Sequence, residues 1–383
     1  MVNNFVSQAE QELTLGFYEC KKDMLMSHLC DGLRFKILII LAVNMCTMMV
    51  YAEGEQMLKP APKGWPEEVK AIEYEASIDA SQQPMLIYTA QAKEKRPLLV
   101  GLHTWSGGYE QAGGEAVYAR WCMENDWHFI HPDFRGPNWT PEACGSEMAV
   151  QDVLDAVIFM QENHSVDVDR IYLVGVSGGG YSSLLMAGRS PEIWAGVSAW
   201  VPITDLGVWW EQCDGKLNYA KHIEKVVGGR PDENPKTIEE CAKRSASTYL
   251  DKAVGVNLDI NAGVTDGHEG GSVPFSHSLY AFNQVVPDKD HIDPDLIEAF
   301  YETETLPEGL EKADTDALYG EKQPIFRKVS KNTRVTIFDG KHEIIHTAAL
   351  NWLAQQRKGK AANWDIKERY DLKTTDNETE SGK

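Results

Sequence analysis

The most constraining feature of this chain is the pentapeptide Gly175-Val176-Ser177-Gly178-Gly179, which stands between two segments of different character. Residues 170–174 form a short apolar run that predicts a buried strand, and residues 181–187 read as a helix. Strand, sharp turn and helix is the context in which the serine of G-x-S-x-G is lifted above a sheet as a nucleophile. Glycines flanking the serine leave room for neighbouring backbone in so tight a turn. We therefore interpret Ser177 as a candidate nucleophile rather than a structural turn residue.

A serine nucleophile needs a general base and an acid that orients the base, and the chain offers both further on. Residues 257–264 read as a buried strand, and the turn after it carries Asp266. Residues 333–338 read as another strand, followed by a turn that carries His342. Because catalytic groups gather in the loops at such strand ends, we predict that Asp266 and His342 act together with Ser177.

Both partners of the serine have rivals close in sequence. Asp259 alternates with apolar residues inside its strand, which favours a structural role. His346 follows His342 by one helical turn, at the expected start of the next helix, and is the competing base. His268 comes just after the acid and is either a substrate contact or an ordinary turn residue. Chain order and position in the turns favour Asp266 and His342.

The rest of the chain alternates between strand-like and helix-like segments. Residues 68–90 alternate in places as antiparallel strands do, and residues 97–103 form a continuous apolar run, typical of a parallel strand buried on both faces. The other expected elements are helices at residues 112–125 and 146–162 and strands at residues 128–131 and 194–201. This alternation predicts an α/β fold with a doubly wound, mostly parallel sheet.

Two insertions interrupt the alternation. The first, residues 205–249, joins the strand after the serine turn to the strand before the candidate acid, and we expect it to cap Ser177. It begins with Trp209 and Trp210, which either stack on sugar rings or form the apolar underside of the cap. The second, residues 288–322, is acidic.

Taken together, these motifs resemble the α/β-hydrolase superfamily. The resemblance is carried by residues 97–104, the turn at Ser177, the loop with Asp266, and Gly340-Lys341-His342. Within the superfamily the chain resembles the prolyl-oligopeptidase-like catalytic domain and secreted bacterial carbohydrate esterases, over residues 68–353. The resemblance implies an α/β-hydrolase fold with inserted cap segments and an acyl-enzyme mechanism.

The resemblance also implies an oxyanion hole made of two backbone N–H groups. One belongs to Gly178, the residue after the nucleophile. The other comes from the loop that follows residues 97–103, where Trp105 is the better candidate and Thr104 the second. Thr104 occupies the place where the superfamily usually has glycine.

Arg135 follows a further expected strand end, in a loop rich in glycine and proline. Two interpretations are open. Arg135 binds an anionic substrate group such as a uronate, or it forms an internal ion pair with Asp133 or Glu147, which we favour slightly.

Three functions fit these residues. The leading hypothesis is a secreted serine esterase that removes an acyl group from a polysaccharide. The first alternative is a serine peptidase of the prolyl-oligopeptidase type, which the lack of a preceding blade repeat weakens. The second is a carbohydrate-binding protein that has lost catalysis. No cluster of histidine, cysteine and carboxylate residues has ligand spacing, so we expect no metal and no cofactor.

Charge and the amino terminus bear on partners and location. A net charge of −21 disfavours binding to nucleic acid or to an anionic membrane surface.

Residues 1–52 read as a signal segment, with basic residues before the apolar run 37–43 and short residues up to Ala52. We expect a secreted or periplasmic protein with a hydrolase domain at 53–357 and a polar tail at 358–383; an uncleaved anchor is the alternative.

Four cysteines follow the signal segment: Cys122, Cys144, Cys213 and Cys241. In an oxidising compartment we favour a Cys213–Cys241 disulfide, because both residues lie in the cap insertion. Four buried free thiols are the alternative.

Overall fold

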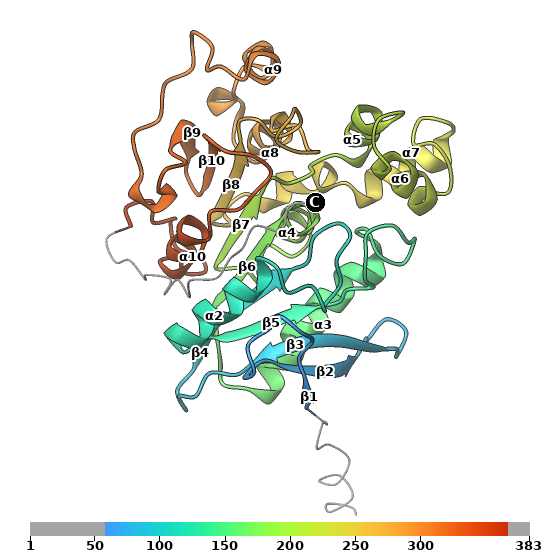
Figure 1. The fold of residues 1–383 in the computed structure, drawn as a ribbon, viewed down its shortest axis with the longest axis vertical. Helices are drawn as coiled ribbons and strands as arrows, with labels where there is room; N and C mark the ends of the chain where they lie inside the picture. The colour runs from blue at the N-terminus through green and yellow to red at the C-terminus, as the bar shows by residue number, and fades with distance from the viewer. Residues whose placement is uncertain (1–57, 367–383) are drawn as a thin grey trace, which may run out of the picture. The chain divides into compact units, whose positions relative to one another are not determined.

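The computed structural model describes residues 58–366 of the chain. These residues form a ten-stranded sheet with the strand order β1-β2-β3-β5-β4-β6-β7-β8-β10-β9 (Figure 1). The strands are β1 (Lys59–Pro60), β2 (Lys70–Glu75), β3 (Gln82–Tyr88), β4 (Arg96–Leu102), β5 (His128–Pro132), β6 (Val166–Val176), β7 (Gly196–Trp200), β8 (Leu258–Gly263), β9 (Pro324–Ser330) and β10 (Thr333–Phe338). The predicted signal segment and the end of the polar tail lie outside the described residues.

The centre of the sheet is parallel, and its two edges are antiparallel. Strands β5, β4, β6, β7, β8 and β10 run parallel to one another. Antiparallel pairing adds β3, β2 and β1 at one edge and β9 at the other. The doubly wound, mostly parallel sheet predicted from the sequence is therefore confirmed. Its parallel arrangement brings the loops after β4, β6, β8 and β10 to one edge.

Helices cover both faces of the sheet. The helices are α2 (Glu115–Asn125), α3 (Glu147–Asn163), α4 (Gly178–Arg189), α5 (Leu206–Cys213), α6 (Tyr219–Val227), α7 (Pro235–Arg244), α8 (Ser276–Val285), α9 (Pro294–Thr303) and α10 (His346–Ala354). Short 3-10 helices occupy Ala246–Thr248, Leu250–Ala253, Asp288–Asp290 and Ala317–Tyr319. Apolar residues of α2 and α10 pack on one face of the sheet, and those of α3, α4 and α8 pack on the other.

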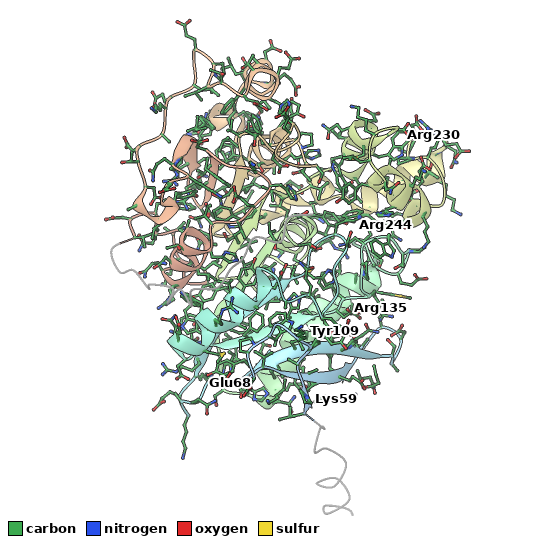
Figure 2. All side chains as sticks on the ribbon, viewed as in Figure 1. Lys59, Glu68, Tyr109, Arg135, Arg230 and Arg244 are labelled. Atoms are coloured by element: carbon green, nitrogen blue, oxygen red, sulfur yellow. The ribbon has the colours of Figure 1, made fainter. Side chains whose placement is uncertain are left out.

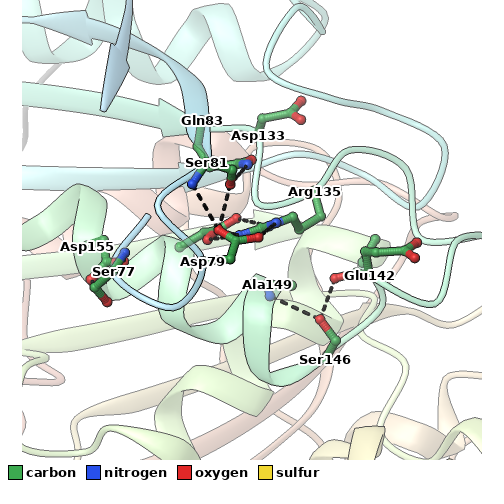
Figure 3. Close-up of polar contacts among 12 residues, drawn as sticks. Ser77, Asp79, Ser81, Gln83, Asp133, Arg135, Glu142, Ser146, Ala149 and Asp155 are labelled. Carbon is green, nitrogen blue, oxygen red and sulfur yellow. Dashed lines mark hydrogen bonds and ion pairs between the residues drawn. The ribbon is translucent and has the colours of Figure 1, made fainter. Parts of the chain in front are cut away.

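Local sequence explains where several helices begin. The Ser146 hydroxyl accepts the Ala149 N–H at the start of α3 (Figure 3). The Asp205 carboxylate accepts the N–H groups of Gly207 and Val208 at the start of α5. Such caps satisfy backbone donors that have no partner inside the helix. Within residues 58–366, every helix is too short or too polar to span a bilayer.

The first insertion, for which we keep the name cap, folds as a small group of helices. Helices α5, α6 and α7 pack against one another and stand together to one side of the sheet, at the upper right of Figure 1. The second insertion contains α9 and leads into β9, an edge strand that the sequence analysis did not predict.

The predicted disulfide is wrong. The four cysteines of the described part of the chain are free and buried. Cys213 lies at the end of α5 and Cys241 within α7, and each is buried on its own helix. Burial raises the pKa of both thiols to about 12, so they pack as small apolar side chains rather than as thiolates.

Candidate active site

Ser177 stands at the turn between β6 and α4 in a strained backbone conformation. Its φ is 59° and its ψ is −119°, a region that residues with a side chain rarely adopt. The Ser177 N–H donates to the Trp200 carbonyl of β7 at 2.9 Å, and the Ser177 carbonyl accepts from Tyr181 in α4 at 2.8 Å. The turn is thus held from both sides, and the half-buried serine lies at the carboxyl edge of the sheet.

The glycines of the turn are required by close backbone packing. A Cβ atom at Gly175 would lie 2.3 Å from the carbonyl carbon of Gly179. A Cβ atom at Gly179 would lie 2.3 Å from the Leu102 carbonyl oxygen at the end of β4. Both contacts are far inside van der Waals distance, so no larger residue fits without moving the strand or the helix.

Asp266 and His342 form a hydrogen-bonded pair at the same edge. The His342 Nδ1 atom lies 2.7 Å from the Asp266 Oδ2 atom. The other carboxylate oxygen accepts the Val273 N–H at 3.2 Å. Asp266 is fully buried, whereas the His342 side chain is 21% exposed. Burial raises the pKa of Asp266, and the hydrogen bond from His342 opposes that rise.

The backbone around this pair leaves no room for other side chains. A Cβ atom at Gly271 would lie 2.0 Å from the Asp266 Oδ1 atom and 2.5 Å from the His342 Cβ atom. The His342 N–H donates to the Gly270 carbonyl at 3.0 Å. The loops after β8 and β10 are therefore packed against each other, which fixes the histidine ring beside the carboxylate.

The rival residues are engaged elsewhere. Asp259 is buried in β8, where its carboxylate accepts from Arg334 at 2.7 Å and from Asn261 at 2.8 Å. His346 is the first residue of α10, and its Nε2 atom lies 3.0 Å from the Gly114 carbonyl oxygen. Of the carboxylates and histidines weighed from the sequence, the structure brings Asp266 and His342 together.

The loop after β4 lies directly against the serine turn. A Cβ atom at Gly178 would lie 2.2 Å from the Trp105 backbone nitrogen. The Thr104 N–H instead donates to the side-chain oxygen of Gln111 at 3.2 Å. Of the two predicted candidates for the second oxyanion donor, Trp105 therefore lies beside Gly178, and the N–H of Thr104 is already occupied.

Trp209 and Trp210 are core residues of the cap. Both are buried, with exposed fractions of 1% and 2%. The Trp209 ring packs edge-on against Trp105 at 4.8 Å between centroids, and its N–H donates to the Ser272 carbonyl at 2.9 Å. The Trp210 N–H donates to Glu224 at 3.1 Å. Neither ring is free to stack on a sugar, so these tryptophans form the apolar underside of the cap.

Arg135 forms an internal ion-pair cluster, but not with the predicted partners. Its guanidinium donates to Asp79 at 2.7 and 3.1 Å (Figure 3). It also donates to Asp152 at 2.7 and 3.0 Å. The expected partners are occupied otherwise, since Glu147 pairs with Arg189 and Asp133 accepts the Tyr109 N–H.

The place of Arg135 in the fold agrees with a structural role. Figure 2 shows Arg135 near the amino-terminal strands, below the cap that carries Arg230. Its side chain is 10% exposed, and two carboxylates occupy its donors. The uronate-binding interpretation therefore has no support in the geometry.

His268 packs against α9. Its ring stacks on Tyr301 with 4.4 Å between centroids, and its Nε2 atom lies 2.8 Å from the Tyr301 carbonyl oxygen. Its Nδ1 atom lies 3.7 Å from Glu304. Through these contacts, His268 joins the second insertion to the loop after β8.

An open hollow of about 540 Å³ adjoins His342. It is lined by Thr265, Gly270, Lys322, Asp339, Gly340, Lys341, His342 and Glu343. These lining residues, which carry charges of both signs, were not predicted as neighbours, because isolated loop residues carry no sequence pattern that marks them as neighbours. Among residues 58–366, no group of three or more His, Cys, Asp or Glu side chains is placed to hold a metal ion.

Part of the chain is similar to a known protein family. Residues 138–293 match the prolyl oligopeptidase family. The matched segment includes Ser177 and Asp266. No curated protein sequence matches the chain significantly.

Two solved structures are similar to part of this chain. An acylaminoacyl peptidase of Pyrococcus horikoshii is 16% identical with a TM-score of 0.46, and the match covers 62% of this chain and 36% of the peptidase. Prolyl oligopeptidase B of Galerina marginata is 17% identical with a TM-score of 0.45, covering 62% and 35%. The chain thus spans about a third of the length of these peptidases. This chain has the fold of an α/β-hydrolase, and over residues 138–293 it resembles the prolyl oligopeptidase family.

Proposed function

We propose that this chain is a serine peptidase that cleaves the amide bond of a peptide through an acyl-enzyme. The observation that carries the proposal is the 2.7 Å hydrogen bond between His342 and buried Asp266, at the sheet edge that also holds the strained Ser177 turn. The match to the prolyl oligopeptidase family favours a peptide over the polysaccharide ester that the sequence analysis preferred.

The proposed roles follow from the hydrogen-bond donors and acceptors of the site. The Ser177 hydroxyl attacks the scissile carbonyl carbon and passes its proton to the Nε2 atom of His342. Asp266 accepts the Nδ1–H of His342, which keeps the ring in the tautomer whose Nε2 is free to act as a base, and stabilises the imidazolium that forms.

Two backbone donors serve the tetrahedral intermediate in this proposal. Its oxyanion accepts hydrogen bonds from the N–H groups of Gly178 and Trp105, whose backbones are in contact. Collapse of the intermediate breaks the C–N bond, and His342 returns the proton to the leaving amine. Water, activated by His342, then hydrolyses the acyl-Ser177 ester and releases the acid.

Amide turnover is the discriminating test, because a serine peptidase also cleaves activated esters. The purified chain and a Ser177→Ala variant are compared on peptidyl p-nitroanilides, on the matched p-nitrophenyl esters and on an acetylated oligosaccharide. We expect release of nitroaniline that depends on Ser177. Deacetylation of the oligosaccharide without any anilide cleavage would overturn the peptidase proposal and return the esterase interpretation.

A further inference from the structure

The loop between β4 and α2 contains a side-chain clamp on Thr104. The Gln111 Oε1 atom accepts both the Thr104 N–H, at 3.2 Å, and the Thr104 hydroxyl, at 2.9 Å. The Gln111 Nε2 atom donates to the Glu115 Oε1 atom at 2.9 Å. Glu115 therefore sets the orientation of the amide, with its oxygen toward Thr104.

The loop backbone is built closely around this amide. A Cβ atom at Gly107 would lie 1.8 Å from the Gln111 Oε1 atom, so only glycine leaves the amide room at this place. The Gly107 N–H in turn donates to the Thr104 carbonyl at 3.2 Å, and the His103 Nδ1 atom lies 2.9 Å from the same oxygen. Both the N–H and the C=O of Thr104 are thus held.

Fixing Thr104 fixes the direction of the next N–H group. The Thr104 carbonyl and the Trp105 N–H belong to one planar trans peptide unit, so they point in opposite directions. With the carbonyl accepting from the Gly107 N–H, the Trp105 N–H points away from it. The Trp105 nitrogen is the atom that a Cβ at Gly178 would approach to 2.2 Å.

Glu115 is a buried carboxyl, and burial of such a group is unfavourable for stability. It is 1% exposed, and its Oε2 atom is buried with no hydrogen-bond partner among the described residues. Burial raises the pKa of its carboxyl to about 7. A buried carboxyl with one unpaired oxygen costs stability, whereas its other oxygen accepts from the Gln111 amide and orients it.

We propose that Gln111, oriented by Glu115, is a positioning residue that holds the Thr104–Trp105 peptide so that its N–H stabilises the oxyanion. The inference rests on the proposed acyl-enzyme chemistry. Neither Gln111 nor Glu115 touches the reacting atoms in this proposal.

The test measures how fast a fluorophosphonate phosphonylates the protein, because that reaction also develops negative charge on an oxygen in the oxyanion hole. We expect Gln111→Met, which keeps the size but removes the amide, to lower the limiting second-order rate constant by about tenfold or more. Glu115→Leu should slow labelling similarly, whereas Glu115→Gln, which keeps an acceptor oxygen, should retain most of the rate. Gln91→Met, in the exposed loop before β4, is the matched control.

The pH profile separates positioning from a general structural defect. Its midpoint reports the base, so Gln111→Met should lower the plateau and leave the midpoint in place. If Gln111→Met is unfolded at the assay temperature, Gln111→Asn carries the test, since its amide is too short to reach both partners. A Gln111 variant that labels within twofold of the wild-type rate would overturn this inference alone. A wild-type chain that does not label at all would overturn the proposed function and the inference with it.

Discussion

His342 and Asp266 lie 2.7 Å apart between Nδ1 and Oδ2, although 76 positions separate them in the chain. Strands β8 and β10 bring them together, because these strands run parallel and pair in register up to Gly263 and Phe338. The loops that follow therefore start side by side, and Gly271 allows them to pack closely. The topology of the sheet thus assembles this pair from two distant turns.

Replacing the acid of this pair should impair catalysis far more than folding. We expect Asp266→Asn to lower kcat/KM by about 10⁴-fold, because the amide stabilises the wrong tautomer of His342. The measurement is hydrolysis of the best substrate found for the wild-type chain, together with thermal unfolding of both proteins.

Asp259 provides the matched comparison. Asp259 lies in β8, the strand that precedes the loop with Asp266, but its carboxylate pairs with buried Arg334. We expect Asp259→Asn to lower the free energy of unfolding by about 3–5 kcal/mol, since it leaves the guanidinium buried without its counter-charge. A loss of activity in folded Asp259→Asn that exceeds the loss in Asp266→Asn would show that the two roles are exchanged.

The cap tryptophans should behave as core residues. We expect Trp209→Ala to lower the free energy of unfolding by about 3–5 kcal/mol, because it leaves a cavity against Trp105 and Tyr219. Small and large substrates should lose turnover to the same degree. If the folded variant instead loses only large substrates, Trp209 contacts substrate and its assignment to the core is wrong.

Glu115 should make stability depend on pH. Its pKa is about 7 in the folded chain against 4.5 for the free group, so the folded state binds more protons between these values. The free energy of unfolding therefore falls as pH rises from about 4.5 to about 7, by about 3 kcal/mol in all.

Glu115→Gln should remove this dependence. Urea unfolding at pH 5 and pH 8 should show the variant gaining stability over the wild type as pH rises. Glu110→Gln, in the exposed part of the same loop, is the control. An equal difference between Glu115→Gln and wild type at both pH values would contradict a raised pKa for this buried carboxyl.

Arg135 should matter for stability and not for charge selectivity. We expect Arg135→Met to lower the free energy of unfolding by about 3–5 kcal/mol, because Asp152 is fully buried and loses its counter-charge. The kcat/KM values of the folded variant for acidic and for neutral substrates should change by the same factor. A selective loss of acidic substrates would revive the anion-binding interpretation.

The sequence predicted those parts of the fold that local patterns specify. Residues 333–338 were expected as a strand and form β10, and the serine turn lies between β6 and α4 as its glycines indicated. The edge strand β9 was missed because Arg327 and Lys328 interrupt its apolar pattern where one side faces solvent. The strand therefore lacks the continuous apolar run that marked the central parallel strands.

Contacts between distant segments were the least predictable. The partners of Arg135 come from a turn before β3 and from α3, so neither is near it in sequence. Cys213 and Cys241 share an insertion, but each is buried on its own helix. Gln111 carries no motif, and its role depends on where the loop returns to Thr104.

Covalent labelling tests the central claim most directly. The intact chain is treated with a fluorophosphonate, and the adduct is located by mass spectrometry beside Ser177→Ala and His342→Ala. The account predicts one adduct, on Ser177, that is absent from Ser177→Ala and greatly slowed in His342→Ala. An adduct on another residue, or a folded wild-type chain that takes up none, would contradict it.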